Sequence, residues 1–261
     1  PSPYLLKLIG YKDSSKCNLC NREPCNTSRI LAGCLQAQRY TWRHDSVLLT
    51  LLPELEKRIT DHNQQAISSD TYSPPMPISS SFVKSGTKPS LVINKAPCRQ
   101  NLLTDANDWQ LLIDFEHQKL VFPPQICSTN KRPDIIIWSQ NHRTVLIIEL
   151  TVPADENIVA AQIRKTARYQ ELSDLVKSIN NWNSKIITIE VGARGFVAKS
   201  MNSFLRSIGF SHKESSSVCK SISMIVARCS HHIFAQRNNT SWHKGPLLVP
   251  YKPDEPNNLK D

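Results

Sequence analysis

Two runs of β-branched residues, joined by a short polar segment, constrain the fold of this chain most. They span 133–138 and 144–152, and Ser139-Gln140-Asn141-His142-Arg143 separates them. Such runs on either side of a polar turn predict a β-hairpin. A further strand is predicted at 109–115, before the hairpin. A long helix at 155–182, a strand at 185–191 and helices at 200–208 and 214–236 are predicted after it. This order predicts an α/β (α+β) fold with a small mixed sheet flanked by helices.

The N-terminal part of the chain differs from this pattern. Four cysteines crowd the first 34 residues, and an amphipathic helix is predicted to follow them. Its apolar positions recur at three- and four-residue steps: Val47, Leu48, Leu51, Leu52, Leu55 and Ile59. A stretch rich in Ser and Pro then has the composition of a linker. We therefore expect a Cys-rich module with its helix at 1–66, a linker at 67–100, the main domain at 101–240 and an irregular tail at 241–261.

The charge of the chain indicates its class of partner. With 32 Lys and Arg against 22 Asp and Glu, the net charge is +10, so the surface should attract polyanions. No segment has the roughly 20 consecutive apolar residues that a membrane-spanning helix needs. We therefore expect nucleic acid as the partner, DNA first and RNA second, and no membrane. The chain starts at Pro1 without a signal peptide, which indicates an intracellular fragment of a longer protein.

A pair of carboxylates is the most specific chemical signal in the sequence. Asp134 and Glu149 are separated by fourteen residues across the predicted hairpin, so their side chains can come close together. Two carboxylates at that distance repel each other unless a cation lies between them. Mg²⁺, or Mn²⁺ in its place, prefers such oxygen ligands, and the backbone carbonyl of Leu150 could supply another. Strand alternation should direct Glu149 and Thr151 away from Ile148 and Leu150. The alternative is that both acids end strands in water or pair with Lys and Arg.

The cysteines at the N-terminus predict a second metal site. Cys17 and Cys20 have the two-residue spacing that lets two thiolates bind one Zn²⁺ from a tight turn. Cys34 is close enough in sequence to be a third ligand. Cysteines clustered in this way favour a metal in a reducing compartment over a disulfide framework.

Several ordered motifs resemble a known family. They are Arg132-Pro133-Asp134, Glu149-Leu150-Thr151-Val152-Pro153, the helix with Lys165 and Tyr169, Ile189-Glu190-Val191-Gly192, and Arg194-Gly195-Phe196. Together they resemble the restriction-like PD-(D/E)xK endonuclease region of site-specific non-LTR retrotransposon polyproteins with one open reading frame. The Cys-rich segment, with Arg39-Tyr40-Thr41-Trp42-Arg43-His44-Asp45 after it, resembles the zinc knuckle that precedes this nuclease.

The resemblance implies roles for individual residues. Nucleases of the PD-(D/E)xK kind usually carry a Lys where this chain has Thr151, and in the retrotransposon group a helix Lys takes its place, which implies Lys165. Tyr169 lies four residues further, on the same helix face. The alternative for Lys165 is a solvated helix lysine. In the knuckle, Arg29 stands where the family has its His ligand, and Arg cannot bind a metal.

The missing His leaves the fourth zinc ligand open. Cys25 could complete a four-Cys site, and His44 is a more distant candidate. The alternative is a decayed site that holds ordinary reduced cysteines.

The resemblance also implies an activity. The chain would be a metal-dependent endonuclease that nicks target DNA in the nucleus, so that the freed end primes reverse transcription by the polymerase portion of the same polyprotein. A remnant that binds nucleic acid without cutting it is the alternative, since the departures at Thr151 and Arg29 could reflect decay. A purely structural segment of the polyprotein would differ from both by not binding DNA in isolation.

Overall fold

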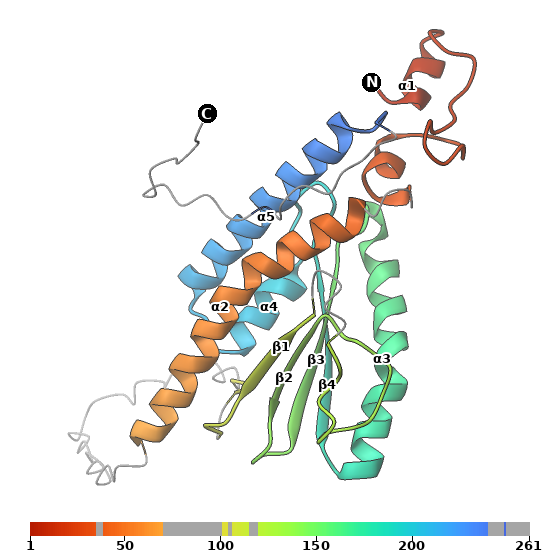
Figure 1. Cartoon of the computed structure of the whole chain (residues 1–261). Helices are drawn as coiled ribbons and strands as arrows, with labels where there is room; N and C mark the ends of the chain where they lie inside the picture. The colour runs from red at the N-terminus through yellow and green to blue at the C-terminus, as the bar shows by residue number, and fades with distance from the viewer. Residues whose placement is uncertain (35–38, 70–100, 104–105, 115–119, 240–247, 249–261) are drawn as a thin grey trace, which may run out of the picture.

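The computed structural model describes residues 1–34, 39–69, 101–103, 106–114, 120–239 and 248. The fold is α/β, with a four-stranded mixed sheet covered by helices and a Cys-rich segment at the N-terminus (Figure 1). The elements are α1 (Pro3–Leu8), α2 (Arg39–Ser69), β1 (Gln110–Ile113), β2 (Ile135–Ser139), β3 (Thr144–Thr151), α3 (Ile158–Asn180), β4 (Asn183–Glu190), α4 (Lys199–Ser207) and α5 (His212–Ala235). The described residues also contain a short π-helix, η1 (Arg29–Gly33), and a 3₁₀ turn, η3 (Asp155–Asn157). The predicted fold class is therefore confirmed.

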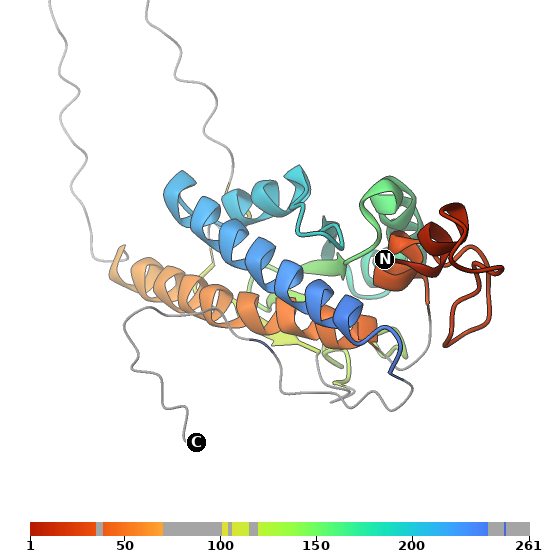
Figure 2. The same cartoon turned by 90° about the horizontal axis from the view of Figure 1, so that it is seen from above.

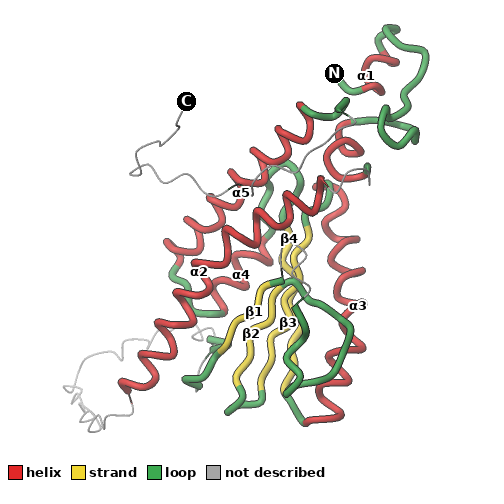
Figure 3. The backbone as a smooth tube through the Cα atoms, viewed as in Figure 1, coloured by secondary structure: helices red, strands yellow, loops and turns green. Residues whose placement is uncertain are grey.

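The strands lie in the order β1-β2-β3-β4 (Figure 3). The first two pairings are antiparallel, and β2 and β3 form the predicted hairpin, with Ile135 opposite Ile148. β4 pairs with β3 in parallel, so that Glu149 lies beside Thr188. A parallel pairing needs a crossover connection, and α3 provides it. The two central strands are thus the two predicted from the β-branched runs.

Both faces of the sheet are buried, because strand residues alternate between two apolar clusters. Ile135 and Ile137 of β2 belong to a cluster shared with α2, α4 and α5. Ile136 and Trp138 belong to a second cluster, shared with α3. Figure 2 shows α2 and α5 running side by side over one side of the molecule. Continuous apolar runs are typical of strands that are covered by helices on both faces.

Helix α2 is longer than the predicted helix and belongs to the main core. It starts at Arg39 and continues through Pro53, and Val47, Leu48, Leu51 and Leu55 are fully buried in the cluster shared with the sheet. This helix was expected within the Cys-rich module at 1–66, but its apolar face packs on α5 and the sheet. Most of the predicted linker and tail, at 70–100, 241–247 and 249–261, lies outside the described residues.

The Cys-rich segment has only a small apolar cluster of its own. Cys17, Cys25, Ile30 and Cys34 form its buried part. The fully buried Arg43 of α2 ties this segment to the rest of the chain. Its guanidinium donates hydrogen bonds to the Leu31 carbonyl (2.9 Å) and the Val152 carbonyl (3.0 Å), and to Ser230 Oγ (2.9 Å). One side chain therefore joins the Cys-rich segment, the end of β3 and helix α5.

Candidate functional site

The two predicted carboxylates meet at one end of the sheet. Asp134 directly precedes β2, and Glu149 lies near the end of β3. The backbone N–H of Asp134 donates to Glu149 Oε2 (3.3 Å), and the backbone N–H of Leu150 donates to Asp134 Oδ2 (2.8 Å). Each carboxylate is thus held by the backbone of the other strand. The pair lies at the ends of the two central strands.

The predicted strand phase is confirmed around Glu149. Ile148 and Leu150 belong to the cluster under α2, α4 and α5, whereas Glu149 contacts Lys165 of α3 on the opposite face. That opposite face is not a separate polar surface, because Val145 and Ile147 earlier in β3 are buried there. Glu149 is itself only 1% exposed. A carboxylate this deeply buried needs compensating partners.

Lysine 165 provides one such partner, since its Nζ forms an ion pair with Glu149 Oε1. Tyr169, four residues later on α3, is also buried, and its hydroxyl donates to the carbonyl of Arg132 (2.9 Å). Tyr169 therefore holds the segment that leads into Asp134. Thr151 is 7% exposed, and its hydroxyl has no hydrogen-bond partner among the described residues.

His44 lies at the carboxylate pair and not at the cysteines. It was a candidate zinc ligand, but its Nε2 lies 3.2 Å from Asp134 Oδ2, and its Nδ1 lies 3.2 Å from Asp45 Oδ1. The imidazole therefore belongs to the carboxylate site. The adjacent His44 and Asp45 at the start of a helix were a visible signal. Contact with Asp134, ninety residues away in sequence, depends on how α2 packs.

The local charges shift the three acid–base groups in different directions. Burial raises the pKa of Glu149, and the negative charge of Asp134 raises it further, against the opposing effect of Lys165. Burial would also raise the pKa of Asp134, but the charge of His44 and its hydrogen bond lower it below the usual value. Burial alone would lower the pKa of His44, and Asp134 and Asp45 instead raise it to about 10. The pair thus combines a strongly acidic and a weakly acidic carboxyl.

An open cavity of about 520 Å³ lies against this site. Asp134, His44, Lys165 and Leu150 line it, and the remaining wall includes Arg132, Arg164, Asp114 and Tyr40. The wall therefore carries acids at the sheet end and cations around them. Carboxylates for a metal beside cations for phosphate are the groups that phosphodiester chemistry needs.

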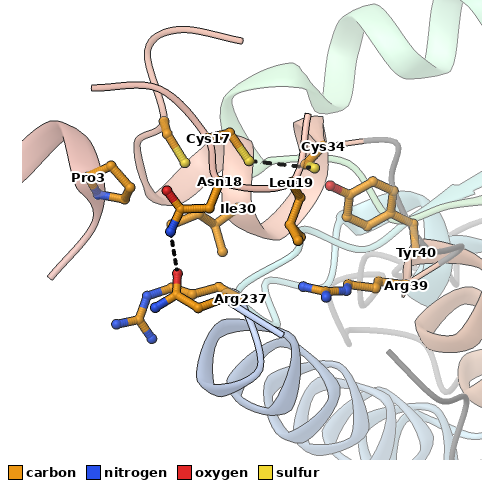
Figure 4. A pocket seen from close by; sticks show the side chains of 11 residues that line it. Pro3, Cys17, Asn18, Leu19, Ile30, Cys34, Arg39, Tyr40 and Arg237 are labelled. Atoms are coloured by element: carbon orange, nitrogen blue, oxygen red, sulfur yellow. Dashed lines mark hydrogen bonds between the residues drawn. The ribbon is translucent and has the colours of Figure 1, made fainter. Parts of the chain in front are cut away.

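The cysteines form a second cluster, at the N-terminus. The sulfur atoms of Cys17, Cys20 and Cys34 all lie within 4.8 Å of one another. Cys17 Sγ is 3.8 Å from Cys34 Sγ, and Figure 4 shows these two side chains directed toward each other. Two thiolates at about 2.3 Å from one tetrahedral zinc would be about 3.8 Å apart. These residues therefore could bind a metal such as zinc.

Cys25 and Arg29 lie beside this group without joining it. Cys25 is buried and lines a small pocket together with Cys17 and Cys34, but its sulfur is not part of the group of three. Burial and the neighbouring thiols raise its pKa to about 12. Burial also acts to raise the pKa of Cys17, but hydrogen bonds from the Cys20 and Leu19 backbone lower it to about 7. The Arg29 side chain donates to the Pro24 carbonyl (3.1 Å). With His44 at the carboxylates, the fourth ligand is not identified.

Comparison with known proteins adds no name to these two sites. No family model matches the chain, and no curated protein matches it. Among the described residues, none of the helices combines the length and apolar character needed to cross a membrane. The residues of the two clusters and their geometry therefore carry the functional interpretation.

Proposed function

We propose that the chain is a metal-dependent endonuclease that cleaves phosphodiester bonds in DNA. The observation that carries this proposal is the pair of carboxylates, Asp134 and Glu149, held by each other's strands beside Lys165. Asp134 and Lys165 line an open cavity. Asp134 Oδ2 accepts a backbone N–H, while no hydrogen bond to Oδ1 occurs within the described residues. Oδ1 is therefore available to a cation.

Each residue has a distinct role in this proposal. Asp134, Glu149 and the Leu150 carbonyl would hold Mg²⁺ or Mn²⁺. A bound ion of this kind polarises the scissile phosphate and lowers the pKa of an attacking water. Lys165 would move from Glu149 toward the phosphate and stabilise the charge that develops there. Tyr169 would keep the segment before Asp134 in place through its hydrogen bond to Arg132.

The wider setting comes from the motifs around the pair. Their resemblance to the nuclease region of site-specific retrotransposons supports a nick in target DNA within the nucleus, made beside the reverse transcriptase portion of a longer polyprotein. The net charge of +10 supports binding of DNA and of RNA. A Zn²⁺ ion bound by the cysteine group would match the zinc knuckle that this resemblance implies beside the nuclease.

A second candidate function is nucleic-acid binding without cleavage. The Lys165–Glu149 ion pair favours it, because Lys165 occupies an oxygen that a divalent cation would otherwise take. Both candidates predict DNA binding that weakens with salt. Only the endonuclease predicts turnover.

A nicking assay on supercoiled DNA with Mg²⁺ or Mn²⁺ tests the proposal, with a salt-dependent DNA-binding titration beside it. Asp134→Ala and Glu149→Ala should abolish cleavage while DNA affinity holds or rises, since each removes a negative charge near the phosphate. Asp174→Ala is the matched control, because Asp174 is an exposed acid on α3 that contacts Gln170. Wild-type protein that binds DNA and never nicks it would leave the binding function. Equal activity in the wild type and Asp134→Ala would indicate a contaminating nuclease.

A further inference from the structure

The imidazole of His44 reaches the carboxylate pair from outside the sheet. Asp134 and Glu149 belong to the hairpin, whereas His44 lies in the first turns of α2. Its Nε2 is 3.2 Å from Asp134 Oδ2. Its other nitrogen, Nδ1, is 3.2 Å from Asp45 Oδ1. A carboxylate can only accept hydrogen bonds, so each ring nitrogen acts as a donor to its acid.

Both partners of His44 have restricted freedom. The Asp45 side chain is 5% exposed and the Asp134 side chain 16%. Val47 and Leu48, in the same part of α2, are fully buried in the main core. The imidazole is therefore attached to a fixed helix at one nitrogen and to Asp134 at the other.

The contact is made at one particular oxygen of Asp134. Oδ2 accepts the backbone N–H of Leu150 at 2.8 Å and also faces His44 Nε2. Two donors on Oδ2, from different elements, restrain the carboxylate of Asp134, which lines the cavity. Groups that hydrogen-bond a metal-binding carboxylate in this way set its orientation.

We propose that His44 is a positioning residue that, supported by Asp45, holds the Asp134 carboxylate so that Oδ1 points to the metal position. This inference rests on the proposed nuclease function. It adds a third element, helix α2, to a site that the sequence motifs place only on the hairpin and α3. His44 acts through Asp134 and does not itself contact the phosphate or the ion.

Two amide substitutions separate positioning from general packing. The amide nitrogen of His44→Gln can take the place of Nε2 and donate to Asp134. The shorter His44→Asn matches Nδ1 and cannot reach Asp134. His44→Ala removes both contacts. His62→Ala is the control, because His62 lies on the same helix and contacts the Ala106 carbonyl.

The first measurement is Mn²⁺ binding to the full chain without DNA, by electron paramagnetic resonance. His44→Ala and His44→Asn should bind Mn²⁺ about 10–100-fold more weakly than the wild type, and His44→Gln should recover most of the loss. His62→Ala should bind as the wild type does. The nicking assay should show the same order, as a rise in the Mn²⁺ concentration needed for half-maximal cleavage.

The outcomes distinguish this inference from the proposed function. If Mn²⁺ affinity follows the expected order of the His44 variants but the wild type never nicks DNA, the nuclease function is contradicted and the positioning role is supported. Wild-type binding in His44→Ala, or equal losses in His44→Gln and His44→Asn, would overturn the positioning role. Wild-type protein that binds no Mn²⁺ would overturn both.

Discussion

The two clusters with metal-binding chemistry are built in opposite ways. The carboxylate pair lies at the ends of the two central strands, between two apolar clusters, and backbone hydrogen bonds orient both acids. The cysteine group lies in a segment with a small apolar cluster of which three members are cysteines. The sheet can therefore position its acids without an ion. The Cys-rich segment has too little apolar core to do the same, and a metal would contribute much of its folding free energy.

The largest expected effect follows from removing the cysteine group. In Cys17→Ser/Cys34→Ser, Zn²⁺ binding should be lost, and with it a contribution of about 10 kcal/mol to the folding of this segment. Amide hydrogen exchange should then show lost protection in residues 1–34 and retained protection in β2 and β3. Cys219→Ser is the control, since Cys219 packs against the main core. Wild-type protein that is fully protected at 1–34 and contains no metal would contradict this comparison.

Arg43 tests how strongly the two regions depend on each other. Arg43→Met should lower the free energy of unfolding by about 3 kcal/mol or more, because it leaves the carbonyls of Leu31 and Val152 without their buried donor. Urea unfolding measures this loss. Arg58→Met should cost about 1 kcal/mol, because the partly exposed Arg58 makes one ion pair with Glu214. Equal losses in the two variants would show that Arg43 does not link the regions.

Lys165 tests the carboxylate region alone. Lys165→Ala should slow cleavage by about 100-fold or more, as expected for a single positioned donor, with a modest loss of DNA affinity. Single-turnover cleavage and a binding titration measure the two effects. Lys177→Ala removes the same charge from the exposed last turn of α3 and should cleave at the wild-type rate. If both variants cleave equally well, Lys165 only balances the charge of the buried Glu149 and takes no part in cleavage.

Much of the sheet region could be predicted because its signals are local. The β-branched runs predict β2 and β3, and alternation within β3 predicts that Glu149 and Leu150 lie on opposite faces. The four-residue spacing of Lys165 and Tyr169 predicts a shared helix face. The structure places Lys165 beside Glu149, and the Tyr169 hydroxyl also lies near Glu149 while it donates to the Arg132 carbonyl.

The contacts that were missed depend on packing between distant segments. His44 contacts Asp134 only because α2 packs in the main core. The periodicity of the sequence predicts which face of α2 is apolar, but it does not predict which elements cover that face. Arg43 looks in sequence like one of many basic residues, yet it is fully buried between three segments. Cysteine spacing identifies Cys17 and Cys20 as a pair, but it does not show that Cys34 joins them and that Cys25 does not.

Two tyrosines that each donate to a backbone carbonyl provide the smallest expected difference. Tyr169 donates to the Arg132 carbonyl at 2.9 Å, and Tyr40 donates to the Arg29 carbonyl at 3.4 Å. Tyr169→Phe should cost about 1 kcal/mol of stability, and it should slow cleavage by less than about tenfold, since it loosens the segment before Asp134 and a neighbour of Glu149 but removes no metal ligand. The longer bond of Tyr40 is weaker, so Tyr40→Phe should change stability by at most about 0.5 kcal/mol. Urea unfolding and single-turnover cleavage on both variants measure these effects. If Tyr169→Phe cleaved DNA as slowly as Lys165→Ala, the Tyr169 hydroxyl would have to act on the substrate. The division of the site into metal ligands, a cation and positioning groups would then need to change.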